Sequence, residues 1–204
     1  MTATRDASSR RTVLLLNEEP ARLDALSQAL SGLGYEPVVC AASSTEAGSA
    51  ALRLDPVAVI VGRRGGHEQA LGLITAISQV GICPVVALLA EPDAGYVGEA
   101  ARSGAWAFVV GLSGDELRSS INLAAERFAQ YRSLQEAFER RAIVEQAKGI
   151  LMARHGIDQS AAFDLLRAHA RRSSRKLVSV AEAVIESHQL LPAEAQQGSS
   201  TLLT

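Results

Sequence analysis

The stretch "PVAVIVGRRGG", from Pro56 to Gly66, is an apolar run that ends abruptly in glycine and arginine. Branched apolar residues fill most of positions 57–61, and Gly62 follows them directly. Such a run is typical of a parallel strand that is buried on both faces and ends at the ligand-binding edge of an α/β sheet. That edge normally presents a reactive side chain, and Gly62 has none. The stretch therefore predicts a parallel sheet and leaves open where the functional residues lie.

Working outward, short apolar runs alternate with segments of helical periodicity through the first half of the chain. The expected strands are residues 12–16, 36–42, 57–61, 84–90 and 105–110, and the expected helices are residues 20–33, 45–54, 67–80, 94–103 and one that opens after Gly114. The connections are too short for a strand to reverse direction, so the strands run parallel. The sequence predicts an α/β doubly wound, five-stranded parallel sheet of the flavodoxin-like type.

The last of these helices continues past the point where such a domain ends. From Asp115 to His155 the chain has no proline and one glycine, Gly149. Apolar residues recur at alternating spacings of four and three, as in a coiled-coil seam. The residues of this predicted dimer seam are Leu117, Ile121, Ala124, Phe128, Tyr131 and Phe138. One interpretation is a helical stalk that pairs with a second copy; the alternative is that the first turns pack on the sheet and a charged linker helix follows.

A small, wholly helical domain is expected after this helix. Its first helix, residues 141–155, ends at Gly156, a residue type that favours helix C-termini. Asp158 is placed to cap a second helix over residues 159–172, and Ser179 to cap a third. The expected apolar faces are Ala162, Phe163, Leu165, Leu166 and Ala170 on the second helix, and Val180, Ala183, Val184 and Ile185 on the third.

Charge is distributed unevenly between these parts. The net charge is −2, but residues 140–176 hold nine Lys/Arg against three acidic residues, a net charge of +6. The remaining chain therefore carries −8. A basic module on an acidic carrier indicates a polyanion as partner, whereas the alternative is an ordinary solvated helical surface.

The composition favours an ordinary globular protein, with 48% hydrophobic and 21% charged residues. No apolar run approaches the ~20 residues of a membrane span, and the N-terminus lacks a signal-peptide pattern. Cys40 and Cys83 lack CxxC spacing and are interpreted as buried, unpaired thiols of a reducing compartment, which predicts a cytoplasmic protein without a membrane partner. Phosphate-binding glycine motifs, grouped metal ligands and nucleophile motifs are absent from the sequence. We expect no catalytic residues, no metal, no cofactor and no enzymatic activity.

Two resemblances follow from particular segments. "VLLLNEEP", "LGYEPV", "DPVAVIV", "CPVVALLA" and "SGAWAFVV" resemble the receiver domain of bacterial response regulators. "IVEQAKGILMARHGIDQSAAFDLLRAHARRSSRKLVSVAEAV", residues 143–184, resembles the ANTAR domain, an RNA-binding module of transcription antiterminators. The expected organisation is a disordered N-terminus (1–11), a receiver-like domain (12–127), a helical stalk (128–140), an ANTAR domain (141–191) and a disordered tail (192–204).

The receiver resemblance implies a phosphoacceptor aspartate, an acidic Mg²⁺ cluster, a hydroxyl and a lysine, each at a strand end. In this sequence the phosphoacceptor position is Gly62, the hydroxyl position is Leu89 and the lysine position is Gly111. The acidic cluster is Asn17, Glu18 and Glu19, in which one expected carboxylate is an amide. The comparison predicts a pseudo-receiver that takes no phosphate at the usual position. Three alternatives stay open for the signal that replaces phosphate: a small ligand, a regulatory protein that sequesters the chain, or constitutive activity without a signal. The arginines and glycines of residues 62–67 offer an anion-binding nest or, alternatively, a plain surface loop.

The ANTAR resemblance implies binding to paired hairpins in nascent mRNA, which prevents a terminator from forming. RNA binding needs cations for phosphate and planar groups for unpaired bases. The candidate RNA-binding residues are Gln146, Ala147, Lys148, Gly149, Arg154, Arg167, Arg171, Arg175 and Lys176. Ala147 and Gly149 suit either close approach of a nucleotide or close helix packing. The rival hypothesis is a regulator that docks a protein partner or binds DNA.

Overall fold

The computed structural model of the protein describes residues 12–16, 19–40, 44–64 and 66–190. The chain divides into two compact units, Met1–Tyr131 and Arg132–Thr204, and each is described by itself. The division falls within the stretch 128–140 that was expected to be a stalk. The segments predicted to be disordered, 1–11 and 192–204, lie outside the described residues.

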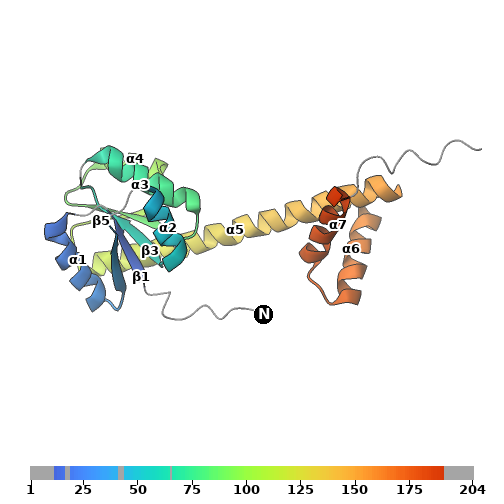
Figure 1. Ribbon diagram of the computed structural model, residues 1–204, viewed down its shortest axis with the longest axis horizontal. Helices are drawn as coiled ribbons and strands as arrows, with labels where there is room; N and C mark the ends of the chain where they lie inside the picture. The colour runs from blue at the N-terminus through green and yellow to red at the C-terminus, as the bar shows by residue number, and fades with distance from the viewer. Residues whose placement is uncertain (1–11, 17–18, 41–43, 65, 191–204) are drawn as a thin grey trace, which may run out of the picture. The chain divides into compact units, whose positions relative to one another are not determined.

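A five-stranded parallel sheet forms the centre of the first unit (Figure 1). Its strands are β1 (Thr12–Leu16), β2 (Glu36–Cys40), β3 (Ala58–Val61), β4 (Val85–Leu89) and β5 (Ala105–Val110), in the spatial order β2-β1-β3-β4-β5. Leu16 pairs with both Cys40 and Val61, so these three strands end level with one another. The predicted doubly wound fold is confirmed.

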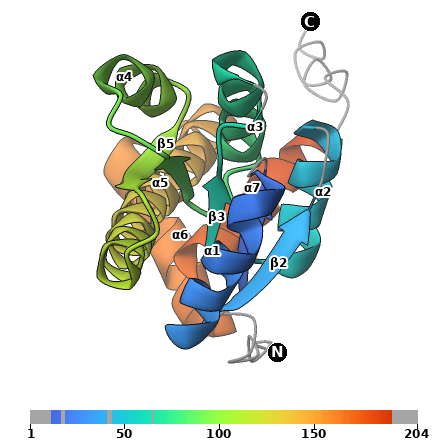
Figure 2. The same ribbon diagram turned by 90° about the vertical axis from the view of Figure 1, so that its left-hand side faces the viewer.

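Helices cover both faces of this sheet (Figure 2). One face carries α2 (Ser44–Leu54), α3 (His67–Val80) and α4 (Ala94–Arg102). The other carries α1 (Pro20–Gly32) and the first turns of α5 (Gly114–His155). Alternate residues of each central strand enter the two cores, which is why the strands are apolar at nearly every position.

The predicted dimer seam on α5 requires correction. Leu117, Ile121 and Ala124 are fully buried in the core of their own unit, and Phe128 is 9% exposed. Phe128 also makes an edge-to-face contact with Trp106 of β5, with ring centroids 5.4 Å apart. These four residues are therefore not available to a second copy. Of the predicted seam, Phe138 is 73% exposed. Tyr131 is 47% exposed, and its ring lies 5.4 Å from that of Trp106.

The second unit holds the end of α5 together with α6 (Gln159–Ser173) and α7 (Leu177–Leu190). Asp158 caps α6 as predicted, because its carboxylate accepts a hydrogen bond from the Ala161 N–H at 2.8 Å. Helix α7 begins two residues before Ser179, so the predicted cap at that residue was wrong. A small core joins the three helices through Ala147, Leu166, Ala170, Val180 and Ala181. Leu165, expected on the apolar face, is instead 49% exposed.

The two thiols differ in their surroundings. Both are unpaired, but Cys40 is partly exposed rather than buried as expected. Burial among apolar residues raises the pKa of the Cys83 thiol to about 12, with a smaller contribution from the Asp55 carboxylate. Cys83 is thus held as an inert core thiol. Among the described residues, none of the helices is long and apolar enough to cross a membrane.

Candidate functional site

Exposed cations on the second unit form the first part of the candidate site. Arg167 and Arg171 lie one turn apart on α6, so their side chains share a face of that helix. Arg175 and Lys176 follow in the connection to α7, where Arg175 Nη2 donates to the Ser179 carbonyl at 3.2 Å. All four side chains are exposed, as are Arg154 and Gln146 on α5. These six predicted residues are accessible to a macromolecular ligand.

Lys148 does not share this exposure. It is 5% exposed, and its ammonium donates to both carboxylate oxygens of Glu145 at 2.9 and 2.8 Å. The same ammonium lies 5.9 Å from the centre of the Phe163 ring, within cation–π range. The expectation of an open phosphate contact at Lys148 is therefore corrected: the side chain is turned inward and already holds an anion.

The small residues on either side of Lys148 have different roles. Ala147 is fully buried in the core of this unit, which matches the alternative of close helix packing. Gly149 is exposed, and a Cβ added there would meet nothing within 4 Å. Glycine inside a helix costs about 1 kcal/mol relative to alanine. Packing within this unit does not account for Gly149, and it leaves the backbone of α5 accessible.

Sequence reasoning missed the partners of Lys148. Glu145 lies three residues before it on the same helix, a spacing that brings side chains together. That spacing was a usable signal. Phe163 was expected in the core and is partly buried beside the lysine. The contact between Phe163 and Lys148 joins α6 to α5, and a local sequence pattern does not predict a contact between two different helices.

The second part of the candidate site is the edge of the parallel sheet at which the strands have their carboxyl ends. Gly62 directly follows β3 and donates its N–H to the Leu16 carbonyl at 2.8 Å. Leu89 ends β4 and is fully buried, and its carbonyl accepts from the Gly111 N–H at 2.9 Å. Glu19 precedes α1 at the same edge. The structure thus brings these four predicted positions to one edge, while Asn17 and Glu18 lie outside the described residues.

An ion pair lies beside this edge. Arg63 Nη1 donates to Asp93 Oδ2 at 2.7 Å, and the Arg63 guanidinium lies 5.2 Å from the centre of the Tyr96 ring. His67 Nε2 is 3.7 Å from the same carboxylate oxygen. The Tyr96 N–H and then Arg63 hold the pKa of Asp93 below its usual value. Burial raises the pKa of Tyr96, whose hydroxyl finds no hydrogen-bond partner among the described residues.

Comparisons with known proteins agree with this division. The ANTAR domain family matches residues 132–185. The first unit has the fold of receiver domains, including that of a modulated diguanylate cyclase from Desulfovibrio desulfuricans (TM-score 0.52, 18% identity, covering 60% of this chain and 98% of that one). NtrX from Brucella abortus is also similar (TM-score 0.52, 22% identity, covering 63% of this chain and 29% of that one). The chain is therefore a receiver-fold protein with an ANTAR domain.

A curated relative extends over nearly the whole length. The transcriptional regulatory protein PdtaR of Mycobacterium tuberculosis is 31% identical over 194 residues, which cover 91% of this chain and 94% of the relative. The chain belongs to the family of ANTAR-domain transcriptional regulators that includes PdtaR.

Proposed function

We propose that this regulator binds paired RNA hairpins in nascent mRNA and prevents transcription termination. The observation that carries the proposal is the exposed cation set of the second unit, Arg154, Arg167, Arg171, Arg175 and Lys176, which lies within the ANTAR match. Guanidinium groups suit phosphate because they are planar, permanently charged and able to donate two parallel hydrogen bonds. Their exposure leaves them accessible to an RNA backbone.

The direct test is a gel-shift titration of the full chain with a two-hairpin RNA, a single hairpin and duplex DNA of equal length. The two-hairpin RNA binds most tightly, and its affinity falls steeply with salt. Equal affinity for duplex DNA would favour the rival DNA-binding function. A protein that shifts neither nucleic acid would favour a regulator that acts through a protein partner.

The proposal for the first unit is that it signals without phosphorylation at the usual position. Gly62, Leu89 and Gly111 offer neither a nucleophile nor a side-chain hydroxyl nor a cation. Mg²⁺ requires oxygen ligands, and the residue at the phosphoacceptor position supplies no side-chain oxygen. A pseudo-receiver of this kind responds to a regulatory protein or a small ligand.

Mass spectrometry tests the pseudo-receiver directly. The full chain is incubated with acetyl phosphate and Mg²⁺ and its intact mass is measured beside a receiver that has its aspartate. The expected mass is unchanged. A single phosphoadduct that maps to residues 12–127 would refute the proposal.

Pairing of two copies through α5 is the third element of the proposed function. Leu134 and Phe138 are 72% and 73% exposed, and their spacing of four residues places them on one apolar stripe of α5. Two copies bring two RNA-binding units together, which suits a paired-hairpin target. The stripe is shorter than the predicted seam because the preceding residues pack on the sheet.

A further inference from the structure

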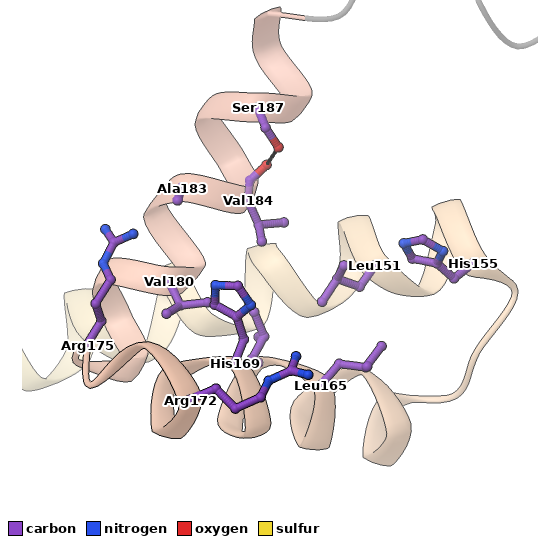
Figure 3. A pocket seen from close by; sticks show the side chains of 11 residues that line it. Leu151, His155, Leu165, His169, Arg172, Arg175, Val180, Ala183, Val184 and Ser187 are labelled. Carbon is purple, nitrogen blue, oxygen red and sulfur yellow. Dashed lines mark hydrogen bonds between the residues drawn. The ribbon is translucent and has the colours of Figure 1, made fainter.

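A groove of about 510 Å³ lies among the three helices of the second unit (Figure 3). It opens between the end of α5, one face of α6 and the middle of α7. Its volume falls within the roughly 300–1,000 Å³ of pockets that bury a small organic group. Arg175 alone among the predicted RNA-binding residues lines this groove.

The inner surface of the groove is apolar. Leu151, Leu166, Val180 and Val184 contribute aliphatic side chains from all three helices. Leu165 also lines the groove, and 49% of its surface is exposed. A flat apolar ligand would cover this surface and remove it from water.

Arginine and histidine side chains form the rim of the groove. They are Arg172, Arg175, His155 and His169, and none of the residues that line the groove is acidic. Figure 3 shows Arg175 and His155 at opposite ends of the groove, with His169 between them. Arg175 is held in place by its hydrogen bond to the Ser179 carbonyl. The ligand that fits is apolar on its faces and negatively charged at its margins.

We propose that the groove accepts one unpaired RNA base, whose flanking phosphates contact Arg172 and Arg175. This inference rests on the proposed function. A base has two apolar faces for the leucines and valines, and unpaired loop bases are recognised by stacking on planar side chains such as histidine and arginine. Continuity with the exposed cations of the same unit favours RNA over a free organic anion, because a polymer contacts both regions at once.

The groove is distinct from the face that carries Arg167 and Arg171. Leu165, His169 and Arg172 follow one another at helical spacings of four and three, so they share one stripe of α6. Arg167 and Arg171 form another stripe of that helix. Phosphate contacts position a nucleic acid, whereas base contacts specify it. The two faces therefore divide affinity and sequence selectivity between them.

The experiment begins with wild-type full chain and a pool of hairpin RNAs with randomised loops. The tightest RNA is then resynthesised with an abasic site at each loop position in turn. One abasic position lowers affinity by tenfold or more, because it removes the base that fills the groove. Ala183→Phe, which fills the groove from α7, lowers affinity for the intact RNA by a similar factor. Ala101→Phe, an equal change at an exposed residue of α4 in the first unit, leaves it unchanged.

The double comparison gives the decisive readout. In Ala183→Phe the critical abasic substitution costs nothing further, and the salt dependence of binding stays as in wild type because no phosphate contact is lost. Additive effects, or wild-type affinity in a folded Ala183→Phe, would overturn the groove assignment and leave the proposed function intact. The wild-type chain alone also tests the assignment. If its RNA affinity depends steeply on salt but no abasic loop position lowers that affinity, the groove assignment is wrong. If the wild type retains no RNA from the pool, the proposed function and this inference both fail.

Discussion

Arg63 donates to Asp93 at 2.7 Å, and this contact links the loop after β3 to the start of α4. Asp93 is also the N-cap of α4, because its other carboxylate oxygen accepts from the Tyr96 N–H at 3.0 Å. One carboxylate therefore holds together two segments that flank the phosphoacceptor position. The link is made by the chain's own charges and needs no phosphoryl group.

The first prediction concerns Asp93. Asp93→Ala removes cap and ion pair together and lowers the Tm of the first unit more than Asp93→Asn, which keeps a capping oxygen. The folded pKa of Asp93 lies below the usual 3.8, so its stabilisation is present above that value and is lost as pH falls through the folded pKa. Thermal melts between pH 2 and pH 6 measure this loss. Asp93→Asn should lack that component, and identical pH profiles would contradict the assignment.

The second prediction concerns Arg167. Arg167→Ala weakens RNA binding and makes the slope of log affinity against log salt shallower by roughly 0.7 to 0.9, the expected change for one lost phosphate contact. The side chain is exposed, so the free energy of unfolding stays within about 0.5 kcal/mol of the wild-type value. Arg102→Ala, an exposed arginine of the first unit, is the charge-matched control. An unchanged slope in Arg167→Ala would show that Arg167 contacts no RNA phosphate.

The third prediction separates Lys148 from the exposed arginines. Lys148→Ala removes a buried stem and a cation–π contact, and it destabilises the second unit by about 1–2 kcal/mol. The Glu145 carboxylate is half exposed, so the ion pair itself contributes little to that figure. Chemical denaturation followed by circular dichroism measures the loss. Lys148→Met keeps the apolar stem and recovers part of it; a fully stable Lys148→Ala would show that the lysine is not structural.

The fourth prediction uses the open space at Gly149. Gly149→Ala stabilises α5 by up to about 1 kcal/mol, because alanine loses less entropy in a helix and its Cβ meets no neighbour. If RNA approaches the backbone here, the same substitution lowers RNA affinity. Stability and affinity then change in opposite directions, which differential scanning calorimetry and gel shift measure in parallel. Unchanged affinity would place the RNA elsewhere on the unit.

The fifth prediction tests pairing through α5. Phe138→Glu places a charge in the exposed apolar stripe and shifts the chain toward monomer in sedimentation equilibrium. Leu52→Glu, at a 61% exposed leucine of α2, is the matched control and leaves the association state unchanged. Equal behaviour of the two variants would exclude this stripe as the pairing surface.

Local patterns in the sequence predicted the sheet because each strand is a short apolar run and each connection is too short for a reversal. The same kind of pattern misled at Leu117, Ile121 and Ala124. Alternating spacings of four and three describe one apolar face of a helix, but the spacing is the same whether that face meets a sheet or another helix. Which partner covers a face is decided by the tertiary fold.

For the candidate site, exposure of the arginines was predictable from their charge and spacing. The inward position of Lys148 was not, because it depends on Phe163, which reaches it from another helix. The groove escaped prediction for a similar reason. Its residues come from three helices, and each helix contributes a side-chain pattern with no special feature of its own.

The inward position of Lys148 has a consequence for regulation by chemical modification. The chain contains two lysines, Lys148 and Lys176, and Lys148 is buried against Glu145. Lysine acetylation removes positive charge, but arginine offers it no target. Lys176 is then the one lysine at which an acetyltransferase meets an exposed amine. The positive charge of the proposed RNA interface is therefore carried mainly by arginine side chains, whose charge lysine acetyltransferases do not remove.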